Sequence, residues 1–379
     1  MEVKMDKMEM YQRGLLAVKA KLLCEGANPD QATLELFAQQ NPSGVKRGGL
    51  SSGGKLKLGG RIFVNAPFYL KREVGLGIQA DLNRVRGVSV IDHQSQTIIV
   101  AGEVLPAPSW YNQRLGEFAI TQIITAHNRQ LAAAVYEDCV LFGLKKECRF
   151  CVMNVSQRQK SCRLMRKSAE LILGALELIP VSEYGGLTLN GGMTLAPGRG
   201  MEIFEPVVRQ ISQRYPGLPI AVEITPPADL GWINRLAEAG VSSLMMNLET
   251  WDLEKRREII PGKDELCPRD LYLRAFARAV GVLGSGKVST CFVVGTESLA
   301  SLREGIRTVV QLGVIPSPLA GRYFEDVPEY RFSPQTDWRD FLEIIYFTAD
   351  QLRQSTLATA DQAGCVACGM CDLIKEVAC

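Results

Sequence analysis

The chain has 379 residues, 46% of them hydrophobic, and this composition is typical of a globular protein with a full core. Its 43 basic and 41 acidic residues leave a net charge of +2, which excludes a strongly basic surface for nucleic acid or an anionic membrane. No apolar run is long enough for a membrane helix and no signal peptide precedes the first charges, so the sequence predicts a cytoplasmic protein.

The first 125 residues predict a separate N-terminal extension, 1–125, that contains both helices and strands. Residues 8–40 are expected to be helical with a break at 26–29, and the Gly, Ser and Lys residues of 43–60 predict a linker or mobile loop. Residues 61–68 predict a strand, and 88–104 predict a hairpin with a polar turn. The extension is expected either to cap the next domain or to bind a partner.

Between residues 126 and 330, apolar strands alternate with amphipathic helices. The predicted strands are 132–140, 186–190, 219–225, 242–249, 288–294 and 314–320, and the predicted helices are 165–179, 200–215, 270–284 and 301–313. Helices between successive strands favour parallel βα units. The predicted fold class is therefore α/β: a partial (β/α)6 TIM-like barrel over 126–330, preceded by the N-terminal α/β extension. A C-terminal helix at 341–355 and a Cys-rich tail complete a third segment, 331–379.

Eleven cysteines stand out in a chain that has only two histidines, His93 and His127. Disulfides are unusual in a reducing compartment, so this many cysteines indicates metal binding or catalysis. The scarcity of histidine argues against mixed Cys/His zinc sites and against Ser-His-Asp or Cys-His catalysis. Thiolate ligands alone favour zinc or an iron–sulfur cluster.

Three of the cysteines, Cys139, Cys148 and Cys151, follow the first predicted barrel strand. Eight residues separate the first two and two residues separate the last two. They fall at the carboxyl end of a strand, where (β/α) barrels place their chemistry. Three thiolates can hold three irons of a [4Fe-4S] cluster and leave the fourth iron open to another ligand. The alternative, zinc, needs a fourth ligand from elsewhere.

Several segments in this order resemble the radical S-adenosylmethionine (SAM) superfamily, and in particular its biotin synthase and lipoyl synthase-like members. They are the Cys148–Cys151 pair CRFC, the Asn190-Gly191-Gly192 run after the second strand, and NLETWD followed by IIPGK at 247–263. The resemblance implies that SAM binds the open iron, that Phe150 lies near the adenine, and that the main chain of Asn190, Gly191 and Gly192 binds the SAM amino group. The eight-residue first gap is wider than in most members, and Met193 replaces the usual glutamate.

Polar residues also close two neighbouring strands. Glu223 ends the third predicted strand, and Asn247 and Glu249 end the fourth. A carboxylate at the end of an apolar strand points away from the core, so these groups are expected to contact SAM or the substrate. The alternative is a pair of solvated charges.

The tail contains a second group, Cys365, Cys368 and Cys371, with Cys379 as a candidate fourth ligand. The Cys-x-x-Cys-x-x-Cys spacing is close to that of ferredoxins and predicts a second, auxiliary [4Fe-4S] cluster. A Cys₄ zinc site and a redox dithiol are the alternatives. The other cysteines singled out, Cys24, Cys162, Cys267 and Cys291, are interpreted as core or surface thiols.

The resemblance implies an enzyme that reductively cleaves SAM to a 5′-deoxyadenosyl radical and abstracts hydrogen from an unactivated C–H bond. Our leading hypothesis is sulfur insertion as in lipoyl synthase, with the auxiliary cluster as sulfur donor. The implied partners are SAM, a reductant such as ferredoxin or flavodoxin, an octanoylated lipoyl-domain protein and a second radical SAM protein. Two alternatives remain: oxidation or rearrangement with the auxiliary cluster as an electron conduit, and a non-catalytic iron–sulfur or zinc protein.

Overall fold

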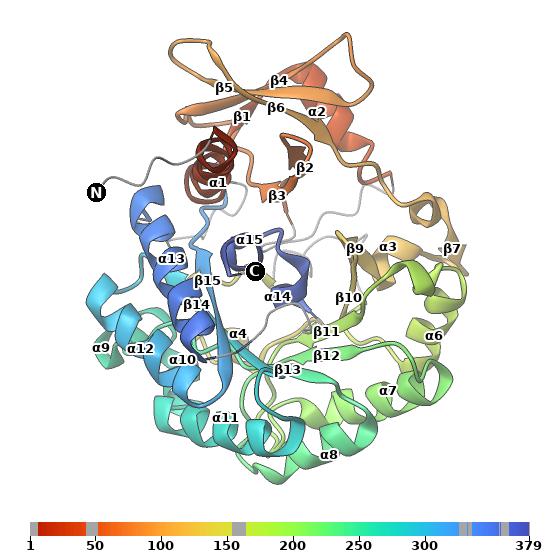
Figure 1. Ribbon diagram of the computed structural model, residues 1–379. Coiled ribbons are helices and arrows are strands. Elements are labelled where there is room, and N and C mark those ends of the chain that lie inside the picture. Colours follow the sequence, from red (N-terminus) through yellow and green to blue (C-terminus); the bar gives the residue numbers. More distant parts are fainter. Residues whose placement is uncertain are drawn as a thin grey trace.

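Two large sheets organise the chain in the computed structural model (Figure 1). The structure describes residues 7–42, 52–153, 164–325, 332, 336–355, 357 and 364–378. A six-stranded sheet forms the N-terminal part, and a seven-stranded sheet with helices around its outer side forms the larger part.

The seven-stranded sheet is an open barrel of six parallel strands with one antiparallel strand at its edge. Its order is β15-β14-β13-β12-β11-β10-β9, in which only β9 runs antiparallel to its neighbour. The strands are β9 Thr125–His127, β10 Gln130–Tyr136, β11 Leu187–Gly191, β12 Ile220–Glu223, β13 Ser243–Met245, β14 Val288–Val294 and β15 Val314–Ala320. The predicted partial (β/α)6 barrel is confirmed.

Amphipathic helices cover the outer side of these strands (Figure 1). The long ones are α6 Ala169–Glu177, α7 Met201–Arg214, α8 Gly231–Ala239, α11 Arg269–Leu283, α12 Leu299–Gln311 and α13 Trp338–Ser355. Shorter helices lie in the connections and the tail: α4 Val140–Gly143 after β10, α9 Leu253–Ile259 and α10 Pro261–Leu266 between β13 and β14, and α14 Cys365–Cys368 and α15 Ile374–Val377 in the C-terminal tail. Every residue of β14 and β15 is buried, as expected for parallel strands covered on both faces. In the described ranges, no helix combines the length and apolarity needed to cross a membrane.

Three barrel strands end earlier than the sequence predicts, all at the candidate site, and one of these, β12, ends at Glu223 instead of residue 225. Strand β10 ends at Tyr136, after a register shift, so Cys139 lies beyond the strand. Strand β13 ends at Met245, two residues before Asn247. The Asn247 side chain accepts a hydrogen bond from the backbone N–H of Cys291 on β14, at 3.2 Å, and so replaces the main-chain pairing that would extend the strand.

The N-terminal sheet has the order β1-β4-β5-β6-β2-β3. Its strands are β1 Asn28–Pro29, β2 Gly54–Leu58, β3 Ile62–Ala66, β4 Leu76–Ala80, β5 Gly87–Asp92 and β6 Ile98–Val104, and the helices α1 Lys7–Glu25 and α2 Gln31–Ala38 precede or flank it. The predicted helical break and the hairpin, which is β5–β6, are confirmed.

The predicted linker is wrong over 54–58. These residues are strand β2, because Leu56 and Leu58 alternate with lysines and both leucines are fully buried. Residues 43–51 of the predicted linker lie outside the described residues. A two-stranded ribbon, β7 Arg114–Leu115 and β8 Phe118–Ala119, and the short helix α3 Ile120–Ile123 lead into the barrel. The domain boundaries at 125 and 330 stay a prediction.

The C-terminal tail returns to the centre of the molecule. Figure 1 shows α14 and α15 inside the ring of barrel strands, with α1 beside α13 at the rim. A Cβ added to Gly364 would lie 3.2 Å from side-chain atoms of Thr188 on β11 and Ala221 on β12. The tail therefore fills part of the barrel interior.

Candidate active site

A cavity of about 470 Å³ occupies the barrel interior, and both groups of cysteines line it. Cys139, Cys148 and Cys151 form the first triplet, and Cys365, Cys368 and Cys371 form the tail triplet. The other candidate residues in its wall are Phe150, Asn190, Gly191, Gly192, Glu223, Asn247 and Glu249. The structure therefore gathers every described candidate residue around one space. Their assignment to SAM or to iron stays a prediction.

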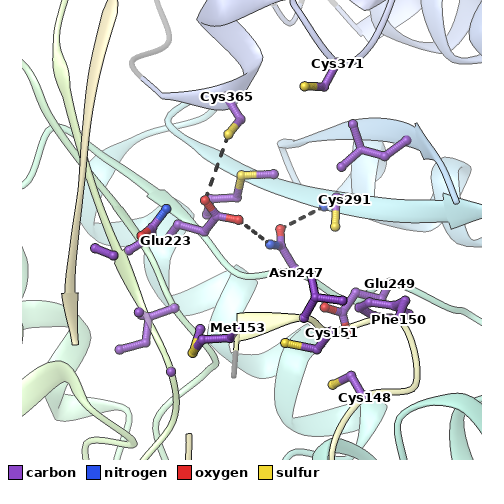
Figure 2. Close-up of a pocket in the computed structure, with 18 of the residues that line it drawn as sticks. Cys148, Phe150, Cys151, Met153, Glu223, Asn247, Glu249, Cys291, Cys365 and Cys371 are labelled. Atoms are coloured by element: carbon purple, nitrogen blue, oxygen red, sulfur yellow. Dashed lines mark hydrogen bonds between the residues drawn. The ribbon is translucent and has the colours of Figure 1, made fainter. Parts of the chain in front are cut away.

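The two triplets lie on different sides of this space. The first triplet follows the carboxyl end of β10. The Cys368 thiol lies 3.4 Å from the carbonyl oxygen of His127, which precedes the opposite end of the same strand. Figure 2 shows Glu223 and Asn247 between Cys365 on one side and Cys148 with Cys151 on the other.

The loop of the first triplet explains the wide gap between its first two cysteines. Residues Val140–Gly143 form the short helix α4, and Cys139 precedes it with an extended backbone. This insertion packs against α10: the N–H of Gly262 donates to the carbonyl of Lys146 at 3.1 Å, and a Cβ on Gly262 would approach Leu141 to 2.5 Å. The extra residues between Cys139 and Cys148 thus pack within the chain against the Pro-Gly-Lys segment that begins α10.

A tight turn and a cross-loop bond fix the close pair. The N–H of Cys151 donates to the carbonyl of Cys148, and the N–H of Arg149 donates to the carbonyl of Ile259, both at 2.9 Å. Phe150 precedes Cys151, and its ring makes an edge contact with the ring of Phe332, with the ring centroids 5.8 Å apart. The CRFC turn is therefore anchored on α9 as well as on its own backbone.

Burial raises the pKa of the Cys148 thiol well above its usual value and that of Cys151 to about 11. Without a metal these thiols are therefore protonated at neutral pH. Metal ligation requires the thiolate, so loading of this loop must release protons.

Gly191 and Gly192 are needed by the packing of the chain itself. A Cβ on Gly192 would lie 1.7 Å from the carbonyl oxygen of Asp138, and one on Gly191 would lie 2.7 Å from that of Tyr136. The N–H of Gly192 also donates to the carbonyl of Tyr136 at 2.9 Å. The glycines thus bring the first-triplet loop against the end of β11, which is an explanation that the sequence reasoning missed. Their role toward the SAM amino group stays a prediction.

Glu223 and Asn247 form a polar bridge across the cavity wall (Figure 2). The Asn247 Nδ2 donates to Glu223 Oε1 at 2.6 Å, and the other oxygen of Glu223 lies 3.9 Å from the Cys365 thiol. Burial raises the pKa of Glu223, although the Asn247 hydrogen bond opposes this effect. The bridge links the end of β12 to the tail triplet.

Glu249 is held in a backbone conformation that is unusual for its residue type. Its φ is +71°. Its N–H donates to the carbonyl of Cys291 and its carbonyl accepts from the N–H of Val293, both on β14. Its carboxylate forms a 2.7 Å ion pair with the Lys263 ammonium. Burial acts to lower the pKa of Lys263, but the negative charge of Glu249 and other groups raises it well above its usual value. Among the residues that the structure describes, the buried Oε2 of Glu249 has no hydrogen-bond partner. Strained buried groups of this kind cluster at functional sites.

The tail triplet sits on α14 and the turn after it. Gly369 ends the helix with φ +66°, which the turn to Cys371 requires. Burial raises the pKa of Cys368 to about 12, and the pKa values of Cys365 and Cys371 also rise. Beside Cys371, the carboxylate of Asp372 accepts a 2.6 Å hydrogen bond from Ser317, and its other oxygen has no hydrogen-bond partner among the described residues.

The remaining cysteines differ in burial, and two of them are not described. Cys267 and Cys291 are buried and Cys24 is half-buried, as expected for core thiols, but Cys291 also faces the cavity beside Met245 and Leu319. The prediction missed this because alternation in a strand does not distinguish a packed barrel interior from one that encloses a cavity. Cys162 and Cys379 lie outside the described residues.

The donor set fits iron–sulfur clusters in its chemistry. Each triplet lines the same cavity with three thiols, all buried or half-buried except the exposed Cys365, and within the described residues one carboxylate oxygen each of Glu249 and Asp372 has no hydrogen-bond partner. Within the described ranges, no three His, Cys, Asp or Glu side chains are arranged around a single metal ion. An iron–sulfur cluster does not need its ligands around a single ion, because each thiolate binds a different iron atom.

The chain is similar at low sequence identity to one curated enzyme and to several solved structures. No protein-family model matches it. It is 22% identical over 276 residues to the bacteriochlorophyllide c C-7(1)-hydroxylase of Chlorobaculum limnaeum. The aligned region covers 67% of this chain and 68% of the relative.

Similar solved structures also lie below 25% identity. They include the [FeFe]-hydrogenase maturase HydG of Carboxydothermus hydrogenoformans (17% identity, TM-score 0.46, 62% of this chain and 54% of HydG). Methylornithine synthase PylB is similar at 16% identity and a TM-score of 0.46, over 64% of this chain and 72% of PylB. HemN of Escherichia coli, a radical SAM enzyme, is similar at 16% identity and a TM-score of 0.39, over 55% of this chain and 50% of HemN. The chain thus spans about half the length of the HydG and HemN structures.

Proposed function

We propose that the protein is a radical SAM enzyme that acts on a C–H bond of a substrate held between two iron–sulfur clusters. One observation carries the proposal: two cysteine triplets, more than 200 residues apart in the sequence, line different sides of a single cavity. In this proposal the first triplet holds the [4Fe-4S] cluster that binds SAM, and the tail triplet holds an auxiliary [4Fe-4S] cluster. Cys379 stays the candidate fourth ligand of the auxiliary cluster.

With both clusters and SAM bound, these groups supply one-electron cleavage of SAM, the 5′-deoxyadenosyl radical and, at the auxiliary cluster, sulfur or an electron acceptor. The chain supplies orientation and exclusion of water. The Glu223–Asn247 bridge and the free oxygen of Glu249 offer hydrogen-bond acceptors for the polar groups of SAM, and Phe150 offers a face for its adenine. Apolar residues such as Ala134, Val293 and Leu319 line the rest of the cavity and shield the radical.

The position of the tail triplet supports sulfur insertion as the finer function. Because Cys365 lies 3.9 Å from Glu223, the auxiliary cluster would border the same space as the substrate instead of lying on the outer surface. A substrate carbon whose hydrogen atom passes to the 5′-deoxyadenosyl radical could then bond to a sulfide of that cluster without leaving the cavity, with an Fe–S bond broken and the remaining electron taken up by the cluster iron. The octanoylated lipoyl-domain protein, the second radical SAM protein and the ferredoxin or flavodoxin reductant stay predictions from the resemblance.

A second candidate is oxidation at the same C–H bond, with the auxiliary cluster as electron acceptor. The 22% identity to an enzyme named as a hydroxylase favours this candidate. The two candidates share hydrogen abstraction and differ in the atom that replaces hydrogen.

The test is anaerobic incubation of the reconstituted protein with SAM and a one-electron reductant, followed by quantification of 5′-deoxyadenosine. We expect the wild type to release it and Cys148→Ala to fall to background, because the first cluster loses a ligand. Cys24→Ala, outside the cavity, should retain release at the wild-type level. If Cys148→Ala still releases 5′-deoxyadenosine, the first triplet is not the SAM site. Loss of auxiliary sulfide in step with a thiolated product supports sulfur insertion, whereas an oxygenated product with intact sulfide supports oxidation.

A further inference from the structure

The turn between Cys368 and Cys371 is held by the N-terminal extension, through contacts that the reaction proposed above does not use. The Lys19 ammonium on α1 donates to the carbonyl of Gly369 and to Glu376 Oε1, both at 2.6 Å. The backbone N–H of Asn65, in β3, donates to the carbonyl of Met370 at 3.0 Å. Two successive carbonyls of the turn are thus bound by residues more than 300 positions earlier in the chain.

Arg322 joins the same contact from the end of β15. Its Nη2 donates to the carbonyl of Asn65 at 2.6 Å and lies 4.0 Å from the Cys371 thiol, and its Nη1 donates to the carbonyl of Ser52 at 3.1 Å. The barrel, the extension and the tail triplet therefore meet at one point. Arg322 lines the cavity there, and its side chain is almost fully buried.

Burial of the Lys19 side chain at this point costs desolvation free energy. Its side chain is fully buried, and an ammonium taken out of water is stabilised only where charged or polar partners replace its hydration. Its two hydrogen-bond partners among the described residues, Gly369 and Glu376, belong to the tail. Packing of α1 against the barrel would be served as well by an apolar residue. The charge is therefore explained by what it does for the tail.

We propose that the N-terminal extension completes the tail-triplet site, with Lys19 as the positioning residue that fixes the Cys368–Cys371 turn and places a positive charge beside an anionic iron–sulfur cluster. This inference rests on the auxiliary cluster of the proposed function. It assigns to the N-terminal extension a role that its sequence does not reveal. It also gives a reason for the position of α1 beside α13 at the barrel rim (Figure 1).

The experiment compares Lys19→Met with wild type in the full-length chain. Methionine keeps the length of the side chain and removes both hydrogen bonds and the charge. Lys57→Met is the matched control, because Lys57 lies on the N-terminal sheet with a partly exposed side chain 4.0 Å from Glu103. After anaerobic reconstitution we expect Lys19→Met to lose about half of the iron, or to keep it with a more negative midpoint potential for one of its two clusters. Release of 5′-deoxyadenosine and the EPR signal of the SAM-binding cluster should not change.

A second readout does not depend on iron. In the reduced, iron-free chain, iodoacetamide should alkylate Cys368 and Cys371 about tenfold faster in Lys19→Met than in Lys57→Met, since charged hydrogen bonds no longer hold the turn. Alkylation of Cys139 and Cys151 should stay unchanged. Wild-type iron content, potentials and alkylation rates in Lys19→Met would overturn the inference. If wild type itself holds only one cluster, the auxiliary cluster of the proposed function is wrong, and a faster alkylation would still show that Lys19 positions the turn.

Discussion

At the scale of single residues, the polar groups at the strand ends are paired with one another before any ligand arrives. Glu223 pairs with Asn247, and Glu249 pairs with Lys263. The sequence analysis placed Glu223, Asn247 and Glu249 at the site because polar residues that end apolar strands point away from the core. It did not single out Lys263, which lies 14 residues after Glu249 and becomes its partner only when α10 folds back. Pairing across a loop leaves no periodic signal.

Lys263→Met tests the weight of this ion pair. The substitution leaves the Glu249 carboxylate buried without its counterion, so we expect a loss of about 3–5 kcal/mol in the free energy of unfolding. Lys263→Met combined with Glu249→Gln should recover much of that loss, since no charge remains. Lys146→Met, at the exposed pair with Glu265, should cost about 0–1 kcal/mol. Urea unfolding measures all three, and equal losses for Lys263→Met and Lys146→Met would contradict this assignment.

At the scale of elements, the order of strands and helices follows from the hydrophobic pattern, whereas the ends of the strands do not. All six predicted barrel strands are present because each is an apolar run between amphipathic helices. Their ends depend on side chains that capture main-chain groups, as Asn247 captures the N–H of Cys291. The linker prediction is wrong over 54–58 because the surrounding glycines and lysines suggested a loop, although Leu56 and Leu58 alternate with lysines as in a strand. The function of the wide cysteine gap also became visible only through its contact with Gly262.

Gly192→Ala tests the contact between β11 and the first-triplet loop. The added Cβ meets main-chain atoms of Asp138 that cannot rotate away, so we expect a loss of about 1–3 kcal/mol or more in stability. The variant should also lose first-triplet iron while the tail triplet keeps its own. Gly281→Ala is the control: it lies in α11, a Cβ there would meet no atom of the described residues within 4 Å beyond its own helix backbone, and the variant should gain about 0.5–1 kcal/mol. Thermal unfolding and iron analysis report both effects, and a Gly192→Ala variant with wild-type stability would refute the close approach.

At the scale of the whole molecule, the main finding is that the tail enters the barrel. The sequence identified the two cysteine triplets by their spacing, and composition excluded most other chemistries. It could not place one triplet relative to the other, because more than 200 residues separate them and no local pattern encodes that distance. Nor could it relate the extension to the tail, since Lys19 and Gly369 meet only in the folded chain.

The central claim is that two clusters share one cavity and that only one of them binds SAM. The most direct measurement is iron content together with EPR, with and without SAM, for the reconstituted wild type and for two triple variants. One variant replaces Cys139, Cys148 and Cys151 with alanine, and the other replaces Cys365, Cys368 and Cys371. We predict about eight irons per wild-type chain and about four in each variant, with SAM changing the EPR spectrum only where the first triplet is intact. Bound zinc without iron–sulfur absorption, or full iron retention in either variant, would contradict the account.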